Sequence, residues 1–157
     1  MSTGRHEARL WAVQFLFQRD FNDAEVADAL DDFWVERTPG PAIRQFCEEL
    51  IKGVEAHKTE LDKHIQQFAE HWNVNRMGAV DRNVMRVAMF EMLHRPDIPP
   101  VVSINEAVEI AKELSGEESG KFVNGILDRA RKDIGRPARG KSDAPPRRTG
   151  TGTGTEP

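Results

Sequence analysis

Apolar residues recur at three- and four-residue spacing along almost all of the first 134 residues, and this period most constrains the fold. The first stripe, within 5–20, is Leu10, Val13, Leu16 and Phe17. This spacing puts side chains on one face of a helix. Similar stripes predict six further helices, near 26–34, 43–54, 61–68, 80–93, 104–114 and 122–134. The only strand-like stretch, 100–102, is too short for a sheet, so we predict an all-α protein of about seven helices.

Capping residues predict where several helices begin and end. The Asn-Asp pair at 22–23 offers an N-cap to the second helix. Two patterns with an acidic residue three positions after a hydroxyl residue, starting at Thr59 and Ser103, predict capping boxes for the fourth and sixth helices. Gly135 is placed to cap the last helix at its C-terminus.

Composition divides the chain into a folded unit, 1–134, and a flexible tail, 135–157. The tail holds four of the nine prolines and five of the twelve glycines. Residues 129–148 carry a net charge of +6, whereas the whole chain carries −4. An acidic body with a basic tail is therefore expected. The tail is interpreted either as a solubilising appendage or as a source of weak attraction to RNA.

The sequence lacks the patterns that most enzymes and metal sites need. No Gly-rich phosphate loop is present. Cys47 lies in an apolar stripe and is predicted to be a buried core residue. His57, His64 and His71 are seven residues apart, about 10.5 Å along a helix, which is too far for two of them to share one ion. We therefore expect no catalysis, no cofactor and no metal.

The chain shows no signal for membrane insertion or export. No apolar run approaches the ~20 residues that span a bilayer, and the first residues do not form a signal peptide. A cytoplasmic protein is therefore expected.

One carboxylate is predicted to be buried. Glu91 follows Val84 and Ala88 by seven and three residues, on the apolar face of the helix at 80–93. A buried carboxylate must find donors or take up a proton. We expect an internal hydrogen bond or ion pair.

Basic and aromatic residues gather at two helix starts. The first helix opens with Arg5, His6 and Arg9. The last is predicted to open with Lys121, Phe122 and Asn124, where free backbone N–H groups could meet a phosphate. From spacing alone, Phe122 is either a core anchor or a platform on which a base stacks.

Three segments resemble signatures of the NusB family of transcription antitermination factors. They are 80–93 (VDRNVMRVAMFEML), 104–112 (INEAVEIAK) and 122–128 (FVNGILD), in the order and spacing of the family. The opening helix, 8–18, is also similar, so the resemblance covers about residues 5–134. Each piece alone is a weak signal, but the combination is specific.

The resemblance implies two small helical subdomains and a non-catalytic adaptor. Family members pair with NusE, a small-subunit ribosomal protein, and bind the single-stranded boxA element of nascent ribosomal RNA leaders. The complex lets RNA polymerase read past terminators. Relatives are monomers or homodimers, so a homodimer is possible here.

The resemblance also implies roles for individual residues. RNA contacts fall on the N-terminal arginines and on the start of the last helix: Arg5, Arg9, Glu118, Ser119, Lys121 and Phe122. From their place in the two basic and aromatic groups, His6 and Asn124 are added as predicted RNA contacts. The NusE-facing positions are Phe17 and Asp81.

Departures from the family pattern leave alternatives open. Relatives often carry a run of arginines where this chain has Arg5-His6-Glu7, so weaker RNA affinity is expected. A protein-only module that has lost RNA binding is therefore the main alternative. A ribosomal RNA methyltransferase would need a separate cofactor-binding domain, for which the 23-residue tail leaves no room.

Overall fold

The computed structural model describes residues 3–70 and 72–135 and is all-helical over these ranges. The elements are α1 (Thr3–Arg19), α2 (Val26–Val35), α3 (Pro41–Phe68), the short 3-10 turn η1 (Val74–Arg76), α4 (Ala79–His94), α5 (Pro100–Ser115) and α6 (Glu117–Ile134). No helix in these ranges is long and apolar enough to cross a membrane. The tail prediction falls on residues 136–157, which lie outside the described residues.

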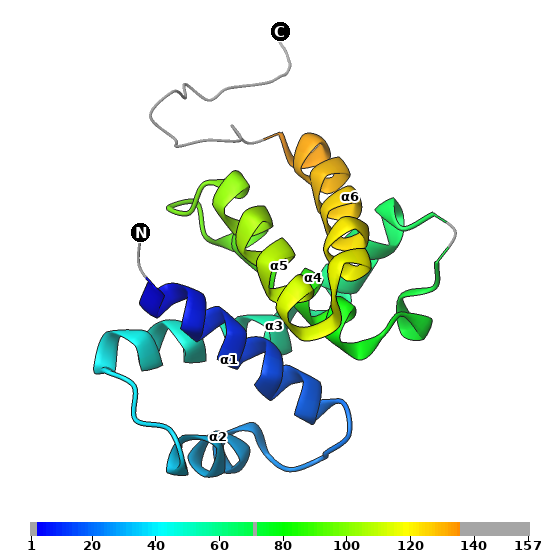
Figure 1. The fold of residues 1–157 in the computed structure, drawn as a ribbon. Coiled ribbons are helices and arrows are strands. Elements are labelled where there is room, and N and C mark those ends of the chain that lie inside the picture. The colour runs from blue at the N-terminus through cyan, green and yellow to red at the C-terminus, as the bar shows by residue number, and fades with distance from the viewer. Residues whose placement is uncertain (1–2, 71, 136–157) are drawn as a thin grey trace, which may run out of the picture.

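Helix α4 is the centre of the fold. It packs against α1, α3, α5 and α6, and every residue from Asn83 to Met92 is buried. Figure 1 shows α1 crossing the molecule between α2, on one side, and the α5–α6 pair, on the other. The buried side chains of all six helices form one continuous cluster. The two predicted subdomains therefore share a single hydrophobic core.

The predicted third and fourth helices are one helix, α3, which corrects the expected count from seven to six within the described residues. The buried residues Val54 and Leu61 are seven residues apart, about two helical turns, and the residues between them include neither Pro nor Gly. Thr59 is therefore inside a helix and caps nothing. A local kink lies at the predicted boundary between the two helices, at His57, whose backbone is non-helical (φ −114°, ψ 18°).

Helix α5 begins earlier than the sequence predicts. Pro100 occupies its first turn, where the fixed φ of proline suits a helix, so residues 100–102 are helical and not strand-like. Ser103 is therefore inside the helix, and the capping-box prediction is wrong. The N-cap prediction at 22–23 is also wrong: α2 has Glu25 as its N-cap, and Asn22 instead accepts a hydrogen bond from the Ala24 N–H.

Helix α6 also begins earlier, at Glu117. A single residue, Gly116, separates it from α5, and its φ of 105° suits glycine. Lys121 and Phe122 therefore lie in the second turn, beyond the free N–H groups of the first, which corrects the prediction that they open the helix. The predicted cap at Gly135 is confirmed, in the left-handed conformation (φ 78°, ψ 13°).

Candidate nucleic-acid and partner interface

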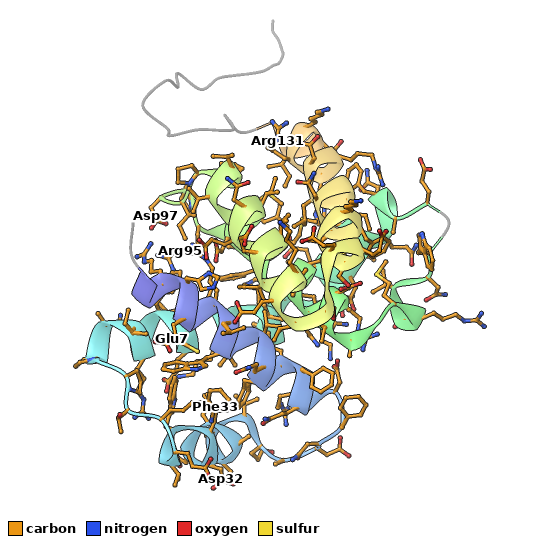
Figure 2. The ribbon with its side chains drawn as sticks, viewed as in Figure 1. Glu7, Asp32, Phe33, Arg95, Asp97 and Arg131 are labelled. Carbon is orange, nitrogen blue, oxygen red and sulfur yellow. The ribbon has the colours of Figure 1, made fainter. Side chains whose placement is uncertain are left out.

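The start of α1 presents one exposed cation, Arg5. Its guanidinium carbon lies 4.3 Å from the centroid of the Phe46 ring on α3. Arg95, at the end of α4, approaches the same ring at 5.4 Å and is paired with Asp97 at 3.0 Å. Figure 2 shows Arg95 and Asp97 beside the first turns of α1. Arg5 and Arg95 thus form a small basic cluster over the Phe46 ring, and Asp97 reduces the net positive charge of this cluster.

His6 faces α5 and contacts two carboxylates. Its Nδ1 lies 2.6 Å from Glu106 Oε1, and its Nε2 lies 3.6 Å from Glu113 Oε1. Burial lowers the pKa of His6, but the hydrogen bonds and charges of Glu106 and Glu113 outweigh it, so the pKa is raised overall. The imidazole is therefore already partnered within the protein.

Arg9 is buried and paired with Glu91. Only 5% of Arg9 is exposed, and its Nε and Nη2 donate to the two Glu91 carboxylate oxygens at 2.7 and 3.1 Å. Ser103 Oγ donates to Glu91 Oε1 at 2.6 Å. The prediction that buried Glu91 finds an internal partner is confirmed. Since a phosphate could reach Arg9 only by breaking this pair, we leave Arg9 out of the proposed RNA surface.

The second group of predicted RNA residues lies on the first two turns of α6. Lys121 Nζ lies 3.8 Å from Glu118 Oε2. Because both side chains are strongly exposed, this ion pair is solvated and weak. Asn124 is exposed one turn further on. Phe122 is half-buried, and its ring lies edge-to-face with Trp72 at 5.6 Å. We call Lys121, Phe122 and Trp72 the α6 cluster.

Trp72 is a residue that the sequence analysis missed. Its side chain is 56% exposed, which is rare for so large an aromatic surface. It lies in the connection between α3 and α4, where no periodic pattern marks it. A tryptophan among the mostly polar residues between two predicted helices is the sequence signal that could have identified Trp72 as a candidate.

A groove is lined by one of the two predicted partner-binding positions, Phe17. The groove has a volume of about 360 Å³ and is lined by residues that include Phe17, Val80 and Leu114, from α1, α4 and α5. Asp81 adjoins Val80 in the first turn of α4. Phe21, which is 73% exposed, packs edge-to-face on Phe17 and extends the apolar surface. Sequence analysis missed Phe21 because it follows the end of α1.

Asp20 holds the end of α1 against α4. Its Oδ2 accepts hydrogen bonds from Arg82 Nη2 at 3.0 Å and from the buried Asn83 Nδ2 at 2.9 Å. These bonds place Phe17, one turn earlier, beside the start of α4. The position of the groove is therefore determined by side chains on both helices.

Asp81 follows Val80 in the first turn of α4 and lies close to Ser119 of α6. Burial raises the pKa of Asp81, and a hydrogen bond with Ser119 only partly offsets this rise. One of its carboxylate oxygens, Oδ1, is buried without a hydrogen-bond partner. A carboxylate kept in a costly setting between two exposed features is a functional-site candidate.

We expect Asp81→Asn to stabilise the protein at neutral pH but not at acidic pH. Because the folded pKa is raised, the folded state binds more protons than the unfolded state between the usual pKa near 3.8 and the raised value. Wild-type stability therefore falls as pH rises through this window, whereas Asn carries no charge. Melting temperatures of both proteins from pH 3.5 to pH 8 test this. A constant difference between them across that range would contradict it.

Cys47 is a core residue, as predicted. It is fully buried, and burial raises the pKa of its thiol to about 12. At neutral pH the thiol is therefore protonated, which makes it a poor nucleophile.

The fold and these surfaces define a small all-α binding module with exposed cations and aromatic rings near its helix ends. Its sequence matches the NusB family model over residues 6–132. The chain belongs to the NusB family.

Relatives and solved structures agree with this assignment. The chain is 41% identical to a transcription antitermination protein NusB of Myxococcus xanthus, covering 85% of this chain and 98% of the relative. It is 44% identical to the protein of that name from Desulfatibacillum aliphaticivorans, covering 84% and 92%. A structure of T. maritima NusB has a TM-score of 0.77 and 40% identity, covering 85% of this chain and 94% of that one.

A solved complex of a more distant relative contains bound partners. It is described as antitermination factors NusB and NusE with double-stranded RNA. The matching chain has a TM-score of 0.76 and 25% identity, covering 85% of this chain and 99% of that one.

Proposed function

We propose that this chain is a transcription antitermination factor that binds boxA RNA together with NusE. The family assignment and the relatives named as antitermination proteins support this role. A relative solved with NusE and RNA supports both partners. In this proposal the chain acts as an adaptor without catalysis, in the cytoplasm, within an antitermination complex of RNA polymerase.

The observation that carries the proposal is the family match over residues 6–132, together with the relative of 25% identity solved with NusE and RNA. NusE is proposed to bind the groove lined by Phe17, Val80 and Leu114. RNA is proposed to bind Lys121 and Phe122, on the first two turns of α6. The starts of α4 and α6 approach each other, because Ser119 is close enough to Asp81 to lower its pKa.

The RNA residues in this proposal are the exposed Arg5, Lys121 and Asn124 and the half-buried Phe122, with Trp72 added from the structure. The pairing of His6 and Arg9 with carboxylates favours weak binding by the chain alone. It also supports the second candidate function, a protein-only module of the same fold. The two candidates differ in whether the complex with NusE selects boxA.

Fluorescence anisotropy distinguishes them. A short boxA RNA and a scrambled RNA are titrated with the chain alone and with its NusE complex, at two salt concentrations. Selective binding that tightens with NusE is expected. A demonstrated NusE complex that does not distinguish the two RNAs would overturn RNA recognition and leave the protein-only module.

Lys121→Ala tests the phosphate contact within the same assay. We expect the salt dependence of log K to weaken by about 0.7, the contribution of one phosphate on single-stranded RNA. Lys132→Ala is the matched control, because Lys132 is exposed on the same helix but lies in its last turn. An equal change in both variants would contradict a specific contact at Lys121.

A further inference from the structure

A cluster of ligating side chains lies where the end of α4 meets α3. It consists of His57 and Glu60 on α3 and His94, the last residue of α4. One ligand atom from each lies within 4.8 Å of the others. The carboxylate oxygen Glu60 Oε1 is 3.3 Å from His57 Nδ1 and 3.0 Å from His94 Nε2. We call these three residues the His–Glu–His cluster.

The kink in α3 is part of this cluster. His57 has the one non-helical backbone conformation that interrupts α3. In a regular helix, residues three apart share a face, so His57 and Glu60 would be neighbours in any case. The third ligand comes from a different helix, since α4 packs along α3 and ends at His94. The cluster is thus a tertiary feature and not a product of local sequence.

The two imidazoles of the cluster stack on each other and on the ring of Phe90. The His57 and His94 rings stack on each other with centroids 4.1 Å apart, and the Phe90 ring stacks with both, at 6.0 and 5.3 Å. Phe90 can lie this close to α3 because residue 53 is glycine. A Cβ on Gly53 would stand 2.2 Å from the Phe90 ring. Because the apolar Phe90 ring packs on the imidazoles, an ion would bind them from the side that faces Glu60 and the solvent.

The end of α4 also suits a cation. His94 is the last residue of α4, where the partial negative charge of the helix C-terminus attracts positive charge.

We propose that the His–Glu–His cluster binds one Zn²⁺ ion. His57 Nδ1, Glu60 Oε1 and His94 Nε2 would be its three protein ligands, with water as the fourth. Two imidazoles and one carboxylate are a ligand set that zinc favours. Zinc bonds of about 2.0–2.1 Å place tetrahedral ligands about 3.3 Å apart, close to the separations of 3.3 and 3.0 Å between Glu60 Oε1 and the two imidazole nitrogens.

The consequence of binding would be a link between α3 and α4. The ion would connect the kink of one helix to the end of the other, and it would bind the folded state only, because the three ligands meet only there. Binding to the folded state alone raises stability by mass action. Zinc should therefore raise the melting temperature, and the rise should grow with the logarithm of the free zinc concentration above Kd.

Isothermal titration of the tag-free full chain with zinc chloride tests the proposal. One ion per chain is expected, with a rise in melting temperature that EDTA reverses. His57→Gln and His94→Gln should each weaken zinc binding by more than about 10-fold, the loss that even outer-shell changes can cause. Glu60→Gln should do the same and serves if either histidine variant folds poorly by circular dichroism.

His6→Gln is the matched control. It removes a histidine that is also hydrogen-bonded to a glutamate, at 2.6 Å, but has no second histidine beside it. Zinc affinity should be unchanged in this variant. The proposal is overturned if zinc does not bind, if His6→Gln weakens binding as much as His57→Gln, or if both cluster variants bind as well as wild type. The last two outcomes would identify adventitious surface binding.

Discussion

Glu91→Leu is expected to lower the free energy of unfolding by about 3–5 kcal/mol, the largest effect of any single substitution considered. The substitution leaves the Arg9 guanidinium buried without its main counter-charge and leaves Ser103 Oγ without its acceptor. Glu106 lies 3.8 Å from Arg9 Nη1, but it is already hydrogen-bonded to His6 at 2.6 Å, which makes it a weak substitute. The cavity beside the pair is only about 10 Å³, room for about one water.

A double-mutant cycle separates the pair from its burial. Arg9→Met alone should cost a similar amount, because it strands the Glu91 carboxylate. The double variant Arg9→Met/Glu91→Leu should be more stable than either single variant, since apolar side chains carry no desolvation penalty. Urea unfolding followed by circular dichroism measures all four proteins. A double variant that costs the sum of the two singles would contradict the coupling.

The double variant also tests the role of Arg9 in RNA binding. If Arg9 is purely structural, the folded double variant should bind boxA RNA with wild-type affinity in the presence of NusE. A weaker salt dependence of RNA binding in that variant would instead show that Arg9 belongs to the RNA surface.

Arg131→Met is the stability control for the loss of an ion pair that is not buried. Its pair with Asp128 is partly exposed, so about 0–1 kcal/mol is expected.

The buried Arg9–Glu91 pair could be predicted from the sequence only in part. The spacing of Val84, Ala88 and Glu91 predicted that this carboxylate is buried, because helical period alone decides which face it occupies. The donors could not be predicted, since Arg9 is 82 residues away and had been assigned to RNA. Ser103 was assigned to a cap because a hydroxyl residue three before a glutamate has the same pattern whether the helix begins there or not.

The candidate site was predicted in part, for a similar reason. Periodicity and resemblance placed Phe17, Asp81 and Phe122 on helices, and the structure arranges them on α1, α4 and α6. Glycine patterns did not reveal that Gly116 alone joins α5 to α6, which moves Phe122 into the second turn. Trp72 was missed because loop residues follow no period, and contacts such as its ring pairing with Phe122 depend on the tertiary fold.

The His–Glu–His cluster was missed because seven-residue spacing was tested only within one helix. That argument against a shared ion still holds for His57 and His64. The third ligand, His94, is 34 residues from Glu60, and only the packing of α4 on α3 brings it within 3.0 Å. A sequence pattern with one ligand on another helix has no fixed spacing to detect.

Phe122→Ala is expected to weaken boxA binding by the NusE complex by about 1–3 kcal/mol, roughly 5- to 150-fold in Kd, the contribution of one stacked base. The ring is half-buried against Trp72, so one face or edge stays available while the neighbour restrains its rotation. Trp72 is itself 56% exposed and can extend the platform to a second base. Anisotropy titration with boxA RNA measures the loss.

Two further variants separate stacking from folding. Phe122→Leu keeps apolar volume against Trp72 but removes the aromatic face, so it should lose as much RNA affinity as Phe122→Ala while melting closer to wild type. Phe21→Ala removes an exposed ring from the partner groove and should leave RNA binding by the chain alone unchanged. If Phe122→Leu binds RNA as well as wild type, the ring serves packing only, and Trp72 and the exposed cations must account for RNA recognition without it.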